Sequence, residues 1–287
     1  MCPPLEPLYM DDFRISVVLP VYSETRTVRQ IVDWLGTHLG ARLLEVIIVI
    51  SPRSSADSQA VCSNLAREDQ RVRVFEQREN PGVGVAFREG YARVRGNVVL
   101  SMDSDGEMEL ATIPRMIAEM ARSNVGLVVG SRWLPGGGFV GYSPIKRWLN
   151  WGFQQLFRVL FRTRLHDLTY GFKLMRTELV RNVAWEATLH EIGCETTLKP
   201  IRLGVSVAEV PTTWRARAEG RSSNNFLRNF RYVGMALSIL VRGVSNSPFE
   251  ACPGAPEPDQ NRDQLQPAGQ VAAAQVLAGQ MTERDLE

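Results

Sequence analysis

Apolar and polar positions alternate in blocks along the first half of the chain. Short runs rich in Val, Ile and Leu have the length and composition of buried strands, and they fall at residues 14–21, 44–50, 72–75, 98–102 and 125–130. Between these runs apolar residues recur at helical spacing, which predicts helices near residues 28–35, 56–67, 84–94 and 112–122. Strands that alternate with helices build βαβ units. The pattern therefore predicts an α/β fold with a doubly wound, mostly parallel sheet.

The second half of the chain has a different pattern. Residues 134–142 form a glycine-rich stretch that we interpret as a mobile lid loop. Beyond this stretch the pattern predicts a strand at 205–210 and helices at 145–160, 191–203 and 226–244. We expect one domain over residues 14–246, an irregular tail at 1–13 and a disordered tail, poor in large apolar residues, at 247–287.

Acidic side chains follow the central apolar run. Residues 97–109 contain Asp103, Asp105 and Glu107 at alternate positions, directly after the predicted strand. In an open α/β sheet, ligands bind at this carboxyl edge of the strands. Three carboxylates aimed at one point repel one another unless a cation lies among them, and hard oxygen ligands suit Mg²⁺ or Mn²⁺. The stretch predicts a divalent metal site; a solvated acidic turn is the alternative.

The composition of the chain excludes some kinds of partner and cellular location. The chain has 287 residues and a formal net charge of +2, which is too small to indicate a nucleic acid as partner. Its four cysteines lie far apart without metal-ligand spacing, as in proteins of a reducing compartment. The first residues lack a signal-peptide pattern, and no apolar run approaches the roughly 20 residues of a membrane-spanning helix. We therefore expect a cytoplasmic protein.

The helix predicted at residues 226–244 is amphipathic and basic. Arginines lie away from an apolar face that consists of Phe226, Phe230, Val233, Leu237, Leu240 and Val244. Such a helix can lie in an anionic membrane interface, which would make the protein peripheral at the inner face of a membrane. It can equally pack on the domain as a core helix, and the sequence leaves both possibilities open.

Seven short motifs occur in a fixed order along the chain. They are Ser-Val-Val-Leu-Pro-Val-Tyr-Ser-Glu at 16–24, Asn-Pro-Gly-Val-Gly-Val-Ala at 80–86, Met-Asp-Ser-Asp-Gly-Glu at 102–107, Gly-Ser-Arg at 130–132, Asp-Leu-Thr-Tyr-Gly-Phe at 167–172, Glu-Val-Pro at 209–211 and Arg-Ala-Glu-Gly-Arg-Ser at 217–222. In this order they resemble the family-2 glycosyltransferases of the GT-A fold. The nearest resemblance is to the dolichol-phosphate mannosyltransferase-like group, which loads a sugar onto a polyprenyl phosphate. It implies a GT-A fold with a nucleotide-binding half and an acceptor-binding half.

On the donor side, the resemblance implies a bound nucleoside-diphosphate sugar. The residues that match donor nucleotide-binding positions are Pro20, Tyr22, Glu24, Asp103, Ser104, Arg217, Arg221 and Ser222. By the same resemblance, the acidic triplet of Asp103, Asp105 and Glu107 would hold the Mg²⁺ or Mn²⁺ that neutralises the leaving diphosphate. Ordinary loop packing and solvated surface charge are the structural alternatives for these positions.

On the acceptor side, the resemblance implies that Arg132 and Arg147 bind the acceptor phosphate, with Lys146 as a substitute for Arg147. A guanidinium suits this role because its planar fork binds phosphate oxygens in pairs and never loses its charge. Asp167 would organise this side, so we assign the catalytic roles to Asp105, Asp167 and Arg132. The alternatives are surface arginines and an Asp167 that hydrogen-bonds only its own loop.

The chain departs from the family pattern at two places. After the second strand, members of the family typically have paired aspartates that read the nucleotide base, whereas this chain continues Ser51-Pro52-Arg53. Ser223 stands where a lysine often follows the last motif. These departures leave the nucleotide and the sugar open.

The motifs favour a metal-dependent inverting glycosyltransferase that acts on polyprenyl phosphate, which is already anionic and needs no protein base. The resemblance alone implies the inversion. One alternative is a soluble enzyme that glycosylates a hydroxyl of a small molecule and would need a base, for which Asp167 and Glu195 are candidates. An alternative of another class is a nucleotide-sugar-binding protein without turnover.

Overall fold

The computed structural model describes residues 7–78, 82–217 and 229–244 of the chain. The chain divides into two compact units, Met1–Glu250 and Ala251–Glu287, and every described residue belongs to the first. The predicted tail at 247–287 therefore lies outside the described residues. The strands are β1 (Ile15–Val21), β2 (Leu43–Ile50), β3 (Val72–Glu76), β4 (Val98–Ser101), β5 (Leu127–Ser131), β6 (Gly138–Val140), β7 (Lys173–Arg176), β8 (Val207–Pro211) and β9 (Thr213–Arg215).

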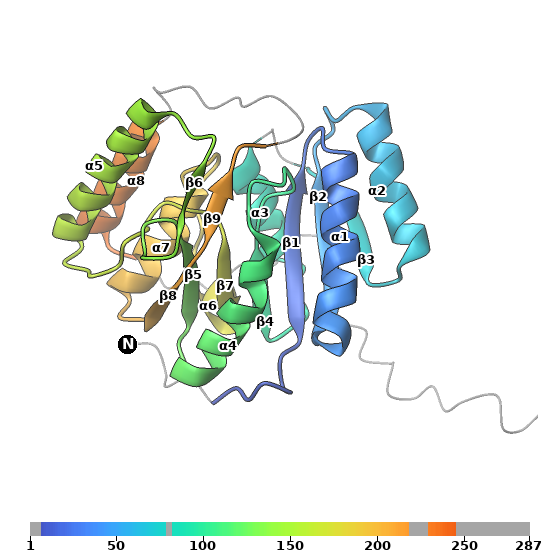
Figure 1. Cartoon of the computed structure of the whole chain (residues 1–287), viewed down its shortest axis with the longest axis horizontal. Coiled ribbons are helices and arrows are strands. Elements are labelled where there is room, and N and C mark those ends of the chain that lie inside the picture. Colours follow the sequence, from blue (N-terminus) through green and yellow to red (C-terminus); the bar gives the residue numbers. More distant parts are fainter. Residues whose placement is uncertain (1–6, 79–81, 218–228, 245–287) are drawn as a thin grey trace, which may run out of the picture. The chain divides into compact units, whose positions relative to one another are not determined.

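Seven of these strands form one sheet in the order β3-β2-β1-β4-β7-β5-β8. Neighbouring strands are parallel except at β7, which is antiparallel to both β4 and β5. The chain first builds outward from β1 through β2 to β3 and then returns to place β4 on the other side of β1 (Figure 1). The strand order thus reverses between β1 and β4, and in open α/β sheets ligands bind at the carboxyl ends of the strands beside such a reversal.

Helices cover both faces of the sheet. They are α1 (Arg26–Leu39), α2 (Ala56–Glu68), α3 (Val83–Tyr91), α4 (Ile113–Ser123), α5 (Pro144–Leu160), α6 (Thr177–Asn182), α7 (Ile192–Arg202) and α8 (Asn229–Arg242), with short 3-10 turns at Gly40–Arg42 and Leu110–Thr112. Successive side chains of a strand point to opposite faces. Val17 of β1 therefore packs in a core with α1, α2 and α4, whereas Val18 packs in a second core with α3, α6 and α7. The predicted doubly wound, mostly parallel sheet is confirmed.

A third, smaller core holds α5 and α8 against α7. Phe157 of α5, Leu198 of α7 and Ile239 of α8 are buried together, and Figure 1 shows α5 and α8 side by side at the left of the view. Of the apolar face predicted for the last helix, Val233, Leu240 and Val244 pack against this core, whereas Phe230 and Leu237 are exposed; Phe226 lies outside the described residues. The helix docks through neighbouring positions and leaves an apolar stripe on its outer side.

Three features of the fold differ from the sequence pattern. The glycine-rich stretch is not only a loop, since β6 within it pairs with β9 in a two-stranded parallel sheet. β7 was not predicted as a strand. Phe13, the last residue of the predicted tail, packs in the core and is 1% exposed.

A helix that crosses a membrane must be long and predominantly apolar. Within residues 7–78, 82–217 and 229–244, no helix is long and apolar enough to cross a membrane.

Candidate active site

The carboxyl ends of the neighbouring strands β1 and β4 bring together the first and third motifs. The hydroxyl of Ser104, just after β4, donates a hydrogen bond of 2.6 Å to the carbonyl oxygen of Pro20 in β1. Ser104 is buried, and its bond ties the acidic loop to the end of the first strand. The structure thus places two of the predicted donor-binding residues next to each other, across the reversal in strand order.

The loop after β1 is held by Glu24. One carboxylate oxygen of Glu24 accepts hydrogen bonds from the backbone N–H groups of Tyr22 (2.8 Å) and Ser23 (3.0 Å). Glu24 is buried, whereas the side chain of Tyr22 is 54% exposed. Glu24 therefore shapes the loop, and Tyr22 is the residue of the pair that remains open to a ligand.

The acidic loop turns sharply at Gly106. This glycine has φ of +77°, a left-handed conformation that side-chain-bearing residues rarely adopt. The N–H of Glu107 donates to Asp105 Oδ1 at 3.1 Å, and the carbonyl of Glu107 accepts from the N–H of Arg215 at 3.0 Å. The hydrogen bond from Arg215 ties the acidic loop to β9.

Arg217 and Trp214 engage two of the three carboxylates. Arg217 reaches Asp105 at 3.0 Å and Glu107 at 2.8 Å, and the indole Nε1 of Trp214 donates to the other oxygen of Glu107 at 2.7 Å. The structure therefore confirms that Arg217 and the acidic loop lie together, although they are more than a hundred residues apart in the sequence.

Burial and mutual repulsion raise the pKa values of the acidic loop. Burial is the main cause for Asp103, whose pKa lies well above its usual value, followed by repulsion from Asp105 and Glu107. Burial, then the charge of Glu107, raises the pKa of Asp105 to about 6. Arg217 opposes both shifts without cancelling them. The loop thus favours additional positive charge.

The chemistry of this loop fits a divalent cation. Among the described residues, no group of three or more His, Cys, Asp or Glu side chains is arranged so that it could hold a metal ion. The donor set nevertheless consists of hard carboxylate oxygens with raised pKa values, and no described residue donates a hydrogen bond to the Asp103 carboxylate. Asp103, Asp105 and Glu107 are the residues that would hold Mg²⁺ or Mn²⁺, and the metal site stays a prediction.

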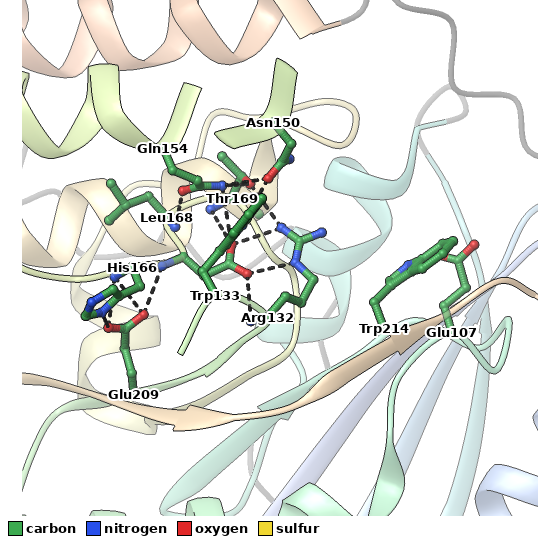
Figure 2. A network of polar contacts seen from close by, with 12 residues as sticks. Glu107, Arg132, Trp133, Asn150, Gln154, His166, Leu168, Thr169, Glu209 and Trp214 are labelled. Atoms are coloured by element: carbon green, nitrogen blue, oxygen red, sulfur yellow. Dashed lines mark hydrogen bonds and ion pairs between the residues drawn. The ribbon is translucent and has the colours of Figure 1, made fainter. Parts of the chain in front are cut away.

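A second cluster forms around Asp167 at the end of β5. The backbone N–H and Nε of Arg132 donate to Asp167 Oδ2 at 3.1 and 2.7 Å, and Arg132 Nη2 donates to Oδ1 at 2.9 Å. Gln154 of α5 donates to Thr169 at 2.8 Å and accepts from the N–H of Leu168 at 2.7 Å (Figure 2). Burial alone would lower the pKa of Arg132, but the Asp167 carboxylate outweighs it and raises that pKa. The arginine is a fixed, permanent cation.

Glu209 fixes the same loop from the side of β8. Its carboxylate accepts hydrogen bonds from the backbone N–H groups of His166 and Asp167, all at 2.9 Å, and it lies 2.9 Å from Nδ1 of His166 (Figure 2). The Glu-Val-Pro motif therefore positions Asp167, and through it Arg132.

Both predicted acceptor arginines lie against aromatic rings. The guanidinium carbon of Arg132 lies 4.3 Å from the ring centre of Tyr170 and 5.3 Å from that of Phe139. Arg147, at the start of α5, lies 5.4 Å from the same Phe139 ring and 5.8 Å from Trp133. Cation–π contacts of this kind hold guanidinium groups in place. The two arginines are thus brought together on one ring.

The rings continue as a wall to the acidic loop. We call Trp133, Phe139, Tyr142 and Trp214 the aromatic wall; their successive ring centres lie 4.9, 5.0 and 4.8 Å apart. The wall starts beside the arginine pair and ends at Trp214, which binds Glu107. Sequence reasoning missed these residues, and the aromatic residues within the glycine-rich stretch were the available signal.

Two further predictions are limited by the structure. Arg221 and Ser222 lie outside the described residues. Glu195 is fully buried, accepts from the N–H groups of Glu186 and Ala187, and lies 2.6 Å from Lys199 Nζ. Its proposal as a general base was wrong, because its carboxylate is saturated inside the protein.

Comparisons with known proteins agree with this geometry. The model of the family described as Glycosyl transferase family 2 matches residues 16–184. An undecaprenyl-phosphate mannosyltransferase of Micrococcus luteus is 26% identical over 215 residues, which cover 73% of this chain and 86% of that protein. Glycosyltransferase AglD of Haloferax volcanii is 28% identical over 238 residues, 79% of this chain, and the match spans only 36% of AglD.

Solved structures with the same fold are also known. The glucosyl-3-phosphoglycerate synthase of Mycobacterium tuberculosis, in complex with Mn²⁺, uridine diphosphate and phosphoglyceric acid, superposes with a TM-score of 0.62 at 19% identity, over 85% of this chain and 88% of that one. At this identity the likeness shows the fold alone, and it confirms the GT-A fold. Because the family model matches more than half of its residues, the chain belongs to glycosyl transferase family 2 and is a glycosyltransferase.

Proposed function

We propose that the protein transfers a sugar from a nucleoside-diphosphate sugar to a polyprenyl phosphate, with Mg²⁺ or Mn²⁺ and with inversion at the anomeric carbon. The aromatic wall carries the proposal, because it joins an arginine pair that suits an acceptor phosphate to an acidic loop that suits a metal-bound diphosphate. The relative that is named an undecaprenyl-phosphate mannosyltransferase supports the same acceptor class.

The donor half lies at the carboxyl ends of β1 and β4. There Tyr22 is open to cover the nucleotide base, and Ser104 fixes the loop beside Pro20. A divalent cation bound at the acidic loop would supply the positive charge that stabilises the leaving diphosphate. Arg217 lies against the acidic loop and can contact diphosphate oxygens from there. Arg221 and Ser222 keep their predicted donor-binding role in this proposal.

The acceptor half is the arginine pair. The bidentate contact with Asp167 uses Nε and Nη2 of Arg132, and no hydrogen bond within the described residues uses its Nη1. That nitrogen and Arg147 are available for phosphate oxygens. The acceptor phosphate is anionic, so Asp167 acts by holding Arg132 rather than by removing a proton.

The positions of the two halves also support inversion. With the diphosphate at the acidic end of the wall and the acceptor phosphate at the arginine end, the sugar would lie between them. The attacking oxygen and the leaving group would then be on opposite sides of the anomeric carbon. A single displacement with this geometry inverts the anomeric configuration.

The outer faces of α5 and α8 support a peripheral contact with a membrane. Large apolar side chains are exposed on both helices; they are Ile145, Trp148, Leu149, Trp151, Leu156 and Val159 on α5 and Phe230, Leu237 and Val241 on α8. Neither helix contains Asp or Glu, and together they carry five Lys or Arg residues: Lys146, Arg147, Arg158, Arg231 and Arg242. Apolar stripes with cationic flanks fit the surface of an anionic bilayer. The surface begins beside Arg147, which would bring the lipid phosphate to the site.

A transfer assay tests the proposal. Purified full-length protein is incubated with Mg²⁺ or Mn²⁺ and a panel of radiolabelled uridine and guanosine diphosphate sugars, with undecaprenyl phosphate, with phosphoglyceric acid or without acceptor. We expect label in the organic phase only when lipid phosphate, a metal and one of the donors are present together. Label that moves only to the small acceptor would favour a small-molecule enzyme. Donor binding without transfer to any acceptor would indicate a binding protein.

A further inference from the structure

The hydroxyl of Tyr170 is buried without a hydrogen-bond partner. Tyr170 is 6% exposed, and its Oη is one of the buried side-chain atoms, within the described part of the chain, that the structure leaves unpaired. An unsatisfied buried polar group destabilises the folded state by about 1–3 kcal/mol. Phenylalanine would fill the same space without that penalty, so a tyrosine here needs another explanation.

The position of Tyr170 connects the two halves of the site. Its ring lies under the Arg132 guanidinium at 4.3 Å. The next residue, Gly171, abuts the acidic loop, because a Cβ atom on it would lie 3.9 Å from Oδ2 of Asp103. Burial, opposed by Arg132 and reinforced by the Asp103 carboxylate, places the pKa of Tyr170 well above its usual value. The hydroxyl therefore stays neutral and keeps its proton to donate.

A substrate can supply the missing hydrogen-bond acceptor. Of the carboxylates that act on Tyr170, Asp167 binds Arg132 and Asp105 binds Arg217. Asp103 receives no hydrogen bond from a described residue, and it forms none with the Tyr170 hydroxyl. A phosphate oxygen is such an acceptor, and both substrates of the proposed reaction bring one to this boundary.

We propose that Tyr170 is a substrate-binding residue whose hydroxyl donates a hydrogen bond to a phosphate oxygen, of the donor diphosphate or of the acceptor phosphate, at the boundary between the two halves. This inference rests on the proposed function and adds a specific contact to it. The tyrosine serves the site twice, since its ring supports Arg132 and its hydroxyl binds the ligand that Arg132 attracts.

Tyr170→Phe tests this role because it retains the ring on Arg132 and removes only the oxygen. The full-length variant is compared with the wild type in thermal unfolding without ligand. Titration calorimetry with Mn²⁺ and uridine or guanosine diphosphate then measures the donor contact, and the KM for undecaprenyl phosphate measures the acceptor contact. A hydrogen bond to a charged group contributes about 1.5–3 kcal/mol, so we expect roughly a 10- to 100-fold loss in one of these two measurements. The midpoint of unfolding should be unchanged or higher.

Tyr91→Phe is the matched control. Tyr91 is also buried, but its hydroxyl is hydrogen-bonded to Ser101 at 2.8 Å. Its loss should lower stability and leave the affinity for both phosphate ligands unchanged.

Two outcomes separate this inference from the proposed function. Equal phosphate affinities for Tyr170→Phe and a wild type that transfers sugar would overturn the role of Tyr170 alone. A wild type that binds neither nucleotide nor lipid phosphate would overturn the proposed function and this inference with it.

Discussion

At the scale of single residues, the acidic loop is a place where one protein cation stands against three carboxylates. Arg217 contacts Asp105 and Glu107, yet the pKa of Asp105 is still raised to about 6 and that of Asp103 lies well above its usual value. The loop has more negative charge than its described neighbours compensate. This imbalance is the physical argument for a divalent cation, and it makes two predictions.

Asp105→Ala should abolish metal-dependent sugar transfer. Losing one ligand from the metal site removes several kcal/mol of transition-state stabilisation, which corresponds to at least about 100-fold in kcat. Stability should change by less than about 1 kcal/mol, because the variant removes a repelled carboxylate. Initial rates and thermal unfolding provide the measurements, with Glu119→Ala, a half-buried carboxylate on α4 that pairs with Arg122, as the control. Unchanged turnover would remove Asp105 from the site.

Acidification should weaken the stabilisation by Mn²⁺. The pKa of Asp105 is raised on folding, so the folded protein holds this proton more tightly than the unfolded chain. Without metal, ionisation of Asp105 destabilises the folded state as pH rises from about 4 to about 6, and the penalty is fully present above 6. Mn²⁺ relieves that penalty at pH 7.5 but must displace protons at pH 5.

Differential scanning fluorimetry with and without Mn²⁺ measures this effect. The increase in unfolding temperature should be several-fold larger at pH 7.5 than at pH 5, and Asp105→Asn should lose most of it. An increase of the same size at both pH values in the wild type would contradict the acidic loop as the metal site.

The sequence predicts which side chains lie together when they belong to one contiguous motif. Asp103, Asp105 and Glu107 follow a recognisable strand, so their clustering could be predicted from the sequence alone. The contact of Arg217 with them could not be derived from local pattern, and only the family resemblance suggested it. Glu195 was misjudged because the sequence does not show that two backbone amides and a lysine already saturate its carboxylate.

At the scale of elements, the strands that were not predicted are too short for an apolar pattern to repeat within them. β7 has four residues, and its two ends, Lys173 and Arg176, are buried although their residue types usually mark a surface. β6 and β9 have three residues each and pair with each other across a long stretch of sequence. Long parallel strands and amphipathic helices were predictable because their periodicity is repeated several times.

Lys173→Met should raise stability at pH 6. Burial lowers the pKa of Lys173 to about 7, and no described carboxylate forms an ion pair with it. Its Nζ donates to the Gly193 carbonyl and to Thr196 Oγ1, each of which has another hydrogen-bond partner. Removing a lone buried charge should stabilise the protein by on the order of 1 kcal/mol or more.

The pH dependence of this gain checks its cause. Because folding lowers the lysine pKa, the wild type is penalised below about pH 7 and recovers stability as pH rises toward the unfolded value near 10.4. Urea unfolding at several pH values should show the gap between variant and wild type narrowing from pH 6 to pH 9.5. A gap that stays constant would rule out buried charge as its origin.

Trp148→Ser with Trp151→Ser should weaken binding to membranes. Both indoles are on the outer side of α5, at 72% and 45% exposure, and each full burial in an apolar environment is worth about 1.5–3 kcal/mol. Cosedimentation with anionic vesicles should fall about tenfold or more. Tyr9→Ser, a 72% exposed aromatic residue outside α5 and α8, is the control. Equal losses in control and double variant would argue against this surface.

At the scale of the whole molecule, the sheet joins the two proposed binding sites, which have opposite charge. The reversal in strand order places the acidic loop after β4, and β5 places Arg132 two strands further along the same sheet. The aromatic wall connects them; Phe139 and Tyr142 lie within the glycine-rich stretch, and Trp133 and Trp214 lie outside it. The fold class was predictable from the alternation of elements, but the wall depends on tertiary packing that no single segment shows.

The most direct test of the account is the structure of the reaction product. We would isolate the glycolipid formed from undecaprenyl phosphate and the preferred donor and record its ³¹P and ¹H nuclear magnetic resonance spectra. The account predicts a sugar joined to the prenyl chain through one phosphodiester, with an anomeric configuration opposite to that of the donor. A sugar attached to a hydroxyl group, or a retained configuration, would contradict attack by an acceptor phosphate held at Arg132 and Arg147.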